Sequence, residues 1–230
     1  MHERHLSIVI PALDAAGRVP ATLAALDEGR RAELVREVIL ADGGSCDGTA
    51  RLAEQAGARV LAGPPGRGRQ LAAGADAAQG DWLLFLHADT VLGPGWAGAV
   101  RAFMDDAGSA THAAVFRLAL DDPDPRARRI ERLARWRGRA LGLPYGDQGL
   151  LISRALYDSV GGFRPLPLME DVDLVRRIGR GRLTVLDAEA VTSAARYRAG
   201  GWWLRPLRNL TLVGLFFLGA PPALLRRLYG

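Results

Sequence analysis

A histidine and an aspartate that follow a buried strand in the first half of the chain are the first residues whose types could do chemistry. Residues 81–89 read DWLLFLHAD, and the apolar run 82–86 is typical of a strand buried on both faces. His87 and Asp89 come directly after it, and open α/β sheets bind ligands at the carboxyl ends of such strands. An imidazole and a carboxylate this close could share a divalent cation. The alternative is a polar strand end that caps the next helix.

Two other predicted strands end in similar polar segments. Residues 11–14 (PALD) follow the strand 6–10, and residues 42–45 (DGGS) follow the strand 35–41. If these ends are adjacent, their carboxylates line one crevice, where they could accept hydrogen bonds from a nucleoside and hold a cation against a diphosphate. The loop 63–69 adds Arg67 and Arg69, whose guanidinium groups suit phosphate oxygens. Each of these signals alone also has a structural explanation. Asp42 could cap a turn, and Arg67 and Arg69 could be solvated loop residues.

The elements that must position these residues alternate between strand and helix. This order predicts an α/β fold with a doubly wound, mostly parallel sheet, flanking helices and an apolar helical tail at the C-terminus. We expect strands at 6–10, 35–41, 58–61, 82–86, 113–120, 150–153 and 183–186. We expect helices at 17–27, 49–56, 70–78, 96–104, 123–141, 155–160 and 171–178, and two more after residue 201. We therefore divide the chain into a domain, 1–200, and a helical extension, 201–230, that packs on the domain or lies at a membrane surface.

Composition agrees with a globular protein, since 49% of the 230 residues are hydrophobic and 24% are charged. All thirty lysine and arginine residues are arginine. The net charge of +5 is compatible with anionic partners such as nucleotides or phospholipids. Nucleic acid is not an expected partner. The single cysteine, Cys46, favours a reducing compartment. No signal peptide is expected, and the apolar run 209–225 is short for a membrane span. We expect a cytoplasmic protein, and peripheral contact with the inner face of the plasma membrane stays open.

Five motifs give the chain a resemblance to a known family. They are SIVIPALD (7–14), EVILADGGSCDGT (37–49), GDWLLFLHADT (80–90), GGF (161–163) and EDVDL (170–174). On these residues the chain resembles the family-2 glycosyltransferases of the GT-A fold. The variants GRGRQLAAGA, FLHADT, YGDQG and PLMEDVDL are similar to a bacterial subgroup assigned to arsenosugar biosynthesis. The resemblance implies transfer of one sugar, with inversion, from a nucleotide-diphospho-sugar to a hydroxyl of a small-molecule or lipid-like acceptor, and a UDP-sugar is the expected donor.

The resemblance also implies roles for individual residues. Asp89, with His87, would hold Mn²⁺ or Mg²⁺, which as a Lewis acid stabilises the leaving diphosphate. Asp171 would be the base that takes the acceptor's proton, with Glu170 beside it to orient the acceptor. The donor would be bound by Pro11, Ala12, Asp14, Asp42, Arg67, Arg69, Gln70, His87, Ala88 and Asp89. The acceptor would be contacted by Asp147, Gln148, Gly162 and Phe163.

Some positions depart from the family pattern. His87 stands where the first acid of the Asp-x-Asp motif is usual, and it could bind the metal, bond the donor or pack at a strand end. Asp14 stands where asparagine is common, and Ala15 replaces the acid that usually follows. The Gln-x-x-Arg-Trp motif of processive synthases is absent, which favours transfer of a single sugar.

Other functions are weighed against this interpretation. A nucleotidyltransferase would place a glycine-rich phosphate loop directly after the first strand, and IPALDAAG is not one. A silent nucleotide-sugar-binding protein would bind donor and metal without needing Asp171. No G-x-G-x-x-G follows a strand, which argues against a dinucleotide-dependent dehydrogenase.

The basic helix and the apolar tail can each be interpreted in two ways. The helix at 126–141 could lie on anionic lipid with Trp136 at the interface, or its arginines could form a solvated face. Trp202, Trp203 and the tail helices are typical of core or dimer packing, with membrane contact as the other interpretation. A homodimer stays open.

Overall fold

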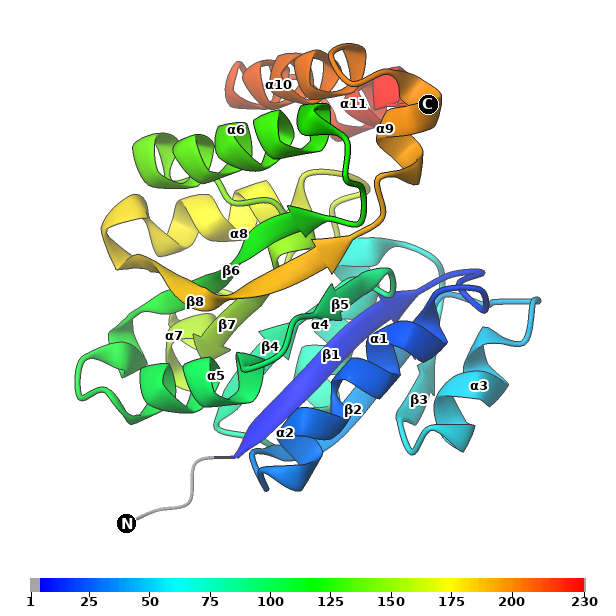
Figure 1. Ribbon diagram of the computed structural model, residues 1–230, viewed down its shortest axis with the longest axis vertical. Helices are drawn as coiled ribbons and strands as arrows, with labels where there is room; N and C mark the ends of the chain where they lie inside the picture. The colour runs from blue at the N-terminus through cyan, green and yellow to red at the C-terminus, as the bar shows by residue number, and fades with distance from the viewer. Residues whose placement is uncertain (1–4, 230) are drawn as a thin grey trace.

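One mixed sheet organises the chain in the computed structural model, which describes residues 5–229 (Figure 1). Within that range the sheet has eight strands in the order β3-β2-β1-β4-β7-β6-β8-β5. The strands are β1 (Leu6–Ala12), β2 (Val35–Asp42), β3 (Arg59–Ala62), β4 (Trp82–Phe85), β5 (Thr90–Leu92), β6 (Ala113–Leu120), β7 (Leu150–Ser153) and β8 (Leu183–Thr192).

The strand pairing brings the three polar strand ends together. β1 lies between β2 and β4 and is parallel to both, with Ala12 opposite Asp42 and Val9 opposite Phe85. The other half of the sheet begins with β7, which is antiparallel to β4 and β6, while β6 and β8 are parallel. The α/β class and the parallel, doubly wound arrangement around β1 are therefore confirmed, and the carboxyl ends of β1, β2 and β4 share one edge.

Helices cover both faces of the sheet because the central strands are buried on both. Ile8 and Leu84 pack under the helices on one face, while Val9, Leu83 and Phe85 pack under those on the other. On the first face lie α1 (Val19–Ala25), α2 (Asp27–Arg31), α3 (Thr49–Gln55) and α5 (Trp96–Asp105), in front of the sheet in Figure 1. On the second lie α4 (Arg67–Ala77), α7 (Arg154–Ser159) and α8 (Glu170–Ile178).

The remaining helices gather at one end of the molecule, at the top of Figure 1. They are α6 (Pro125–Leu141), which packs on β6, and α9 (Ala195–Gly200), α10 (Leu204–Phe217) and α11 (Pro222–Tyr229). Leu212, Val213 and Leu225 of the tail pack against Met169 and Val172 at the start of α8. The tail therefore covers the end of α8 that carries the acidic residues. Among the described residues no helix has the length and apolarity to cross a membrane.

The N-terminal helical segment differs from the single helix expected over 17–27. The chain forms α1 and then α2, with the fully buried Leu26 at the junction. The carboxylate of Glu28, in the first turn of α2, accepts hydrogen bonds from the backbone amides of Gly95 and Ala97 at 3.0 Å. The second helix is thus oriented to cap the start of α5, a contact between distant segments that the local pattern does not reveal.

Helix α4 begins at Arg67, three residues before the predicted start, so Arg67 and Arg69 lie in its first turn and not in a flexible loop. The glycines of GPPGRGR indicated a loop because glycine is a poor helix former. Packing outweighs that preference: Leu71 and Ala75 are buried against the sheet. Gly68 also permits a close approach, since a Cβ there would lie 2.4 Å from the carbonyl oxygen of Arg164.

The last strand was expected to end at residue 186, but β8 continues to Thr192 and pairs with the unpredicted β5. Asp187 and Glu189 are the charged residues of the added segment. They point to solvent on alternate positions, while Leu186, Ala188 and Ala190 are buried between them. Both carboxylates form ion pairs with Arg117 on the neighbouring β6. The alternation is that of a half-buried strand.

Replacing Gly74 by alanine should destabilise the protein, because a Cβ there would lie 2.4 Å from Cγ1 of the buried Val9. Overpacking of this kind costs about 1–3 kcal/mol, although alanine is the better helix former. The control is Gly98→Ala in α5, where nothing lies within 4 Å of the new methyl group. The control should gain up to about 1 kcal/mol. Urea denaturation measures both, and equal stabilities for the two variants would contradict the close packing of α4 on β1.

Candidate functional site

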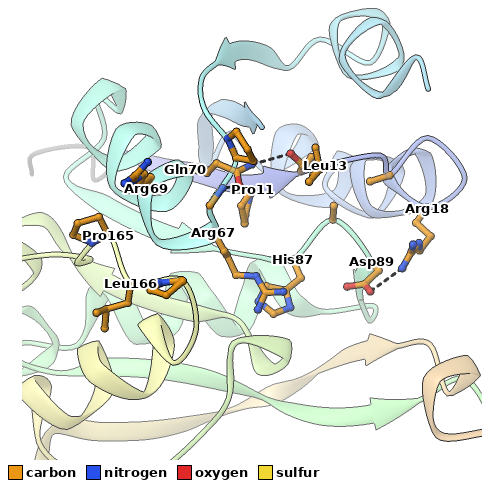
Figure 2. Close-up of a pocket in the computed structure, with 16 residues that line it drawn as sticks. Pro11, Leu13, Arg18, Arg67, Arg69, Gln70, His87, Asp89, Pro165 and Leu166 are labelled. Carbon is orange, nitrogen blue, oxygen red and sulfur yellow. Dashed lines mark hydrogen bonds and ion pairs between the residues drawn. The ribbon is translucent and has the colours of Figure 1, made fainter. Parts of the chain in front are cut away.

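A cavity of about 610 Å³ lies at the edge where β1 and β4 end (Figure 2). Eight of the ten residues predicted to bind a donor line it, and a segment that was not predicted, 165–167, closes it from the other side. The eight are Pro11, Ala12, Arg67, Arg69, Gln70, His87, Ala88 and Asp89. Asp14 and Asp42 are not among the lining residues.

The carboxylates of Asp14 and Asp42 are used within the loops, which corrects the expectation that they line the crevice. Asp42 accepts hydrogen bonds from the amides of Gly44 and Ser45, at 3.1 and 3.0 Å, and from the Ser45 hydroxyl. Asp14, at a φ of +47°, accepts from the amide of Cys46 at 2.9 Å, and its own amide donates to the Ser45 hydroxyl oxygen at 2.9 Å. The two residues therefore connect the loop after β1 to the turn after β2.

Gln70 fixes the floor of this cavity. Its buried side-chain amide donates hydrogen bonds of 2.8 Å to the carbonyl oxygens of both Ala12 and Ala41. These oxygens lie at the ends of β1 and β2, and the Ala12 oxygen also accepts a hydrogen bond of 2.8 Å from the Gly43 amide. Gln70 thus holds two strand ends at a fixed spacing while it lines the cavity.

His87 and Asp89 lie in the turn between β4 and β5. The turn is held by a hydrogen bond of 3.1 Å from the Thr90 amide to the His87 carbonyl oxygen, and by the Thr22 hydroxyl, which donates to the Ala88 carbonyl at 2.9 Å. The Asp89 carboxylate lies 3.4 Å from the Arg18 guanidinium (Figure 2). The described residues contain no group of three or more His, Cys, Asp or Glu side chains able to hold a metal ion. One or two protein ligands suffice for a cation that also binds substrate phosphates, so this donor set fits Mg²⁺ or Mn²⁺ of that kind.

A second cavity, of about 120 Å³, shares a wall with the first. Arg67, His87 and Asp89 line both cavities. The predicted residues Asp147, Glu170 and Asp171 line only the second of the two, together with residues of α10 and α11. The structure therefore brings Asp89 and Asp171 to the lining of the second cavity and leaves Asp42 outside the linings of both cavities.

Asp171 is held rigidly in the first turn of α8. Its Oδ2 accepts the amide of Gly146 at 2.7 Å, and its Oδ1 accepts the amide of Val172 at 2.8 Å. Gly146 permits a close approach, because a Cβ would lie 2.6 Å from His87 Nε2 and would displace that ring. The residue before the helix pair, Met169, has a φ of +65°, a conformation that is strained for a side chain of this size and that concentrates at functional sites.

Glu170 and Asp147 are buried carboxyl groups with raised pKa values. Burial raises the pKa of Glu170 to about 7, the negative charge of Asp171 adds to this, and Arg67, 3.4 Å away, opposes it. Burial raises the pKa of Asp147 to about 6, with further contributions from Asp171 and Asp89. The buried Oδ1 of Asp147 has no hydrogen-bond partner within the described residues. Burial therefore favours the neutral form of both carboxyl groups at mildly acidic pH.

Three of the four predicted acceptor residues lie outside the second cavity, which corrects their expected placement. Gln148 is buried and donates to the Phe116 carbonyl oxygen at 3.0 Å. The Phe163 ring packs edge-on against Phe85, with centroids 4.8 Å apart. Gly162, at a φ of +55°, lies so close to Tyr157 that a Cβ would be 2.9 Å from its ring. These residues support the site from behind, and only Asp147 faces the cavity.

Sequence reasoning missed the part of this cavity that the tail supplies. Arg205, Asn209 and Val213 of α10 line it, and so does Tyr229 of α11. The Oδ1 atom of Asn209 is buried without a hydrogen-bond partner within the described residues. A signal was present, since Arg205, Asn209 and Val213 are four residues apart and therefore share one helix face. Two polar side chains on the inner face of an apolar helix are typical of a site, not of core packing.

Comparison with known proteins identifies the family. Residues 7–164 match the family model described as Glycosyl transferase family 2. The chain belongs to this family. It is a glycosyltransferase with the GT-A arrangement of sheet and helices. No curated protein sequence matches the chain.

Solved structures share the fold of this glycosyltransferase. Glucosyl-3-phosphoglycerate synthase from Mycobacterium tuberculosis, in complex with Mn²⁺, UDP and glucosyl-3-phosphoglycerate, is 21% identical with a TM-score of 0.63, over 95% of this chain and 81% of that one. Mannosyl-3-phosphoglycerate synthase from Rubrobacter xylanophilus is 20% identical with a TM-score of 0.63, over 95% and 76%. TarS residues 1–349 from S. aureus are 15% identical with a TM-score of 0.61, over 83% and 60%. At these identities the likeness concerns the fold.

The raised pKa of Glu170 predicts a pH dependence of stability. The folded chain keeps a proton on Glu170 that the unfolded chain releases near pH 4.5, so the free energy of unfolding should fall as the pH rises from about 4.5 to about 7. A shift of this size corresponds to about 3 kcal/mol. In Glu170→Gln the side chain cannot titrate, so the fall in the free energy of unfolding between about pH 4.5 and pH 7 should vanish. The lost contact with Arg67 should lower that free energy equally at every pH, because arginine stays charged.

Chemical denaturation of both proteins between about pH 4 and pH 8 measures the difference. Glu54→Gln, at an exposed position on α3, is the matched control and should keep the wild-type slope. A wild-type slope in Glu170→Gln would show that another group titrates.

Proposed function

We propose that this glycosyltransferase moves one sugar, with inversion, from a nucleotide-diphospho-sugar to a hydroxyl group in the second cavity. The observation that carries the proposal is the shared wall: Arg67, His87 and Asp89 line both cavities. A donor in the larger cavity would present its sugar to the smaller one, where Asp171 lies. The two reactants would thus meet across the wall that three functional side chains form.

The larger cavity suits the nucleoside diphosphate. Arg67 and Arg69, in the first turn of α4, supply positive charge for phosphate oxygens. His87 and Asp89 would hold Mn²⁺ or Mg²⁺, which when bound supplies Lewis-acid stabilisation of the leaving diphosphate. A UDP-sugar is the proposed donor; the M. tuberculosis enzyme of the same fold has been solved with UDP and Mn²⁺. Pro11 and Ala12 would border the nucleoside, while Asp14 and Asp42 would support the loops around it.

Asp171 is the proposed base. The hydrogen bonds from Gly146 and Val172 fix its carboxylate in one orientation at the second cavity. A carboxylate so placed can take the proton of an attacking hydroxyl while the nucleoside diphosphate leaves on the opposite face, which inverts the anomeric carbon. Glu170, buried and 3.4 Å from Arg67, is a positioning residue that keeps the guanidinium at the shared wall.

The acceptor would be bound partly by the tail, which supplies Arg205, Asn209, Val213 and Tyr229 to the second cavity. The cavity of about 120 Å³ admits a small hydroxyl-bearing group, and it is lined by Tyr145, Tyr197 and Tyr229 and by the polar Asn209. The unpartnered oxygens of Asp147 and Asn209 are suited to accept hydrogen bonds from acceptor hydroxyls. We therefore propose that residues 201–230 are an extension that completes the acceptor site. The motif similarity to the arsenosugar-biosynthesis subgroup supports a small acceptor of that class, and a lipid-like acceptor would place only its head group here.

A cytoplasmic location completes the proposal. Cys46 is exposed and free, as expected for a protein of a reducing compartment.

Asp171→Asn should reduce turnover by about 10²–10⁴-fold, because the amide cannot accept the acceptor's proton. Binding of UDP, measured by thermal shift, should stay close to wild type, since Asp171 lies outside the larger cavity. Asp158→Asn, at an exposed position of α7, is the matched control and should keep full activity. Wild-type turnover in Asp171→Asn would exclude it as the base. An enzyme that releases pyrophosphate instead of a nucleoside diphosphate would contradict glycosyl transfer.

Asp89→Asn should lose the part of donor binding that depends on the cation. For the wild type, UDP with Mn²⁺ at about 100 times its dissociation constant should stabilise the protein by about 2.7 kcal/mol, and omission of Mn²⁺ should remove much of this gain. In Asp89→Asn the stabilisation by UDP should be the same with and without Mn²⁺. An unchanged response to Mn²⁺ in this variant would place the cation elsewhere.

A further inference from the structure

Exposed apolar side chains gather on one face of the molecule. Among the described residues, every exposed large hydrophobic side chain except Leu13 and Val185 lies on α6 or within 203–228. The most exposed are Leu218, Leu204 and Trp203, with 85%, 71% and 67% of their surfaces exposed, and Leu207 and Trp136 follow with 62% and 57%. We call the outward surfaces of α6, α10 and α11 the tail face. Apolar patches of this kind mark interaction sites.

Positive charge is concentrated on the same helices. Residues 125–141 contain seven arginines and one glutamate, and residues 191–230 contain six arginines and no acidic residue, so the two segments together carry a formal charge of +12. Because the whole chain carries +5, the remainder carries −7. An excess of arginine from coding bias alone would not separate the charges in this way. Arg132 and Arg135 are exposed on α6 beside its exposed apolar residues, so the partner of the tail face should be anionic with an apolar interior.

The apolar stripes of α6 and α10 meet. On α6, Arg129, Leu133 and Trp136 are spaced for one helix face, and on α10 Leu207 and Leu210 continue from Trp203 in the same manner. The Arg129 guanidinium lies over the Trp203 ring, 6.0 Å from its centroid, where the two stripes approach each other. Figure 1 shows α6 and α10 together at the end of the molecule farthest from α2. The two stripes therefore approach each other at Trp203, at the start of α10.

We propose that the tail face docks on an anionic lipid bilayer. Helices that lie in a membrane interface combine Trp and Leu on the buried side with basic residues at the head groups, as this face does. A second copy of the chain is a poor occupant, because a two-fold interface would bring this positive charge against itself. Nucleic acid would use the arginines but not the exposed leucines. An anionic bilayer complements the tail face both in charge and in apolar character.

Docking would also orient the active site, a consequence that rests on the proposed function. Leu207 and Leu210 point outward on α10, whereas Arg205, Asn209 and Val213 of the same helix line the second cavity. A bilayer on the outer side of α10 would therefore lie one helix away from the acceptor. The acceptor would then be taken from the membrane surface or its immediate vicinity.

Vesicle co-sedimentation of the full chain, without any nucleotide sugar, tests the docking independently of the transferase proposal. The wild type should bind phosphatidylcholine vesicles that contain phosphatidylglycerol, bind pure phosphatidylcholine weakly, and dissociate at high salt. Arg132→Glu/Arg135→Glu and Leu207→Ser/Leu210→Ser should each lower the partition coefficient about tenfold or more. Circular dichroism and the unchanged thermal shift with UDP verify that the variants are folded.

Two matched controls lie away from the tail face. Arg36→Glu/Arg51→Glu makes the same change in net charge at exposed positions, and Val185→Ser removes an exposed apolar side chain from β8. Both should bind as the wild type does. Absence of vesicle binding, equal binding to both lipid mixtures, or equal loss in the controls would overturn the proposal. So would a dimer, detected by analytical ultracentrifugation, that Leu207→Ser/Leu210→Ser dissociates.

Discussion

The contact between Arg67 and Glu170 joins the two halves of this enzyme. Arg67 begins α4, which packs on β1 and β2, and Glu170 begins α8, which follows the antiparallel half of the sheet. Glu170 is almost completely buried, so ionising it without a partner would be costly, and its guanidinium neighbour at 3.4 Å offsets that cost. Because Arg67 also lines both cavities, this one contact fixes the position of the wall that they share.

Close approaches at glycine make this arrangement possible. Gly68 lets the first turn of α4 lie against the backbone of the segment 164–166, and Gly146 lets the loop before β7 pass between His87 and Asp171. A methyl group at either position would separate the helices and loops that form the shared wall. The strained φ of Met169 belongs to the same constraint, since it turns the chain into α8 so that Glu170 and Asp171 enter the site together. The geometry of the site is therefore determined by backbone contacts as much as by the acidic side chains.

Much of this could be predicted from sequence because the signals are local. Apolar runs that end in polar residues located β1, β2 and β4 and, with them, most of the larger cavity. The sequence could not show that the carboxylates of Asp14 and Asp42 bond amides of Cys46, Gly44 and Ser45, because these contacts depend on loop conformation. The contribution of the tail was missed because it depends on how α10 packs against α8. The polar residues on the inner face of α10 can be identified once the orientation of the helix is known. The apolar composition of the tail gives no indication of them.

His87 can be understood from the charges around it. Asp89, Asp147, Glu170 and Asp171 lie on one connected pair of cavities, and the two carboxyl groups with raised pKa values show how strongly burial and mutual repulsion act there. Family relatives that the sequence resembles carry an acid where His87 stands. A fifth carboxylate would add to this repulsion, which Arg67 offsets at Glu170 and Arg18 offsets at Asp89, each from 3.4 Å. An imidazole avoids the added negative charge and still offers a nitrogen at the shared wall. The substitution thus fits a site whose acidic residues are crowded.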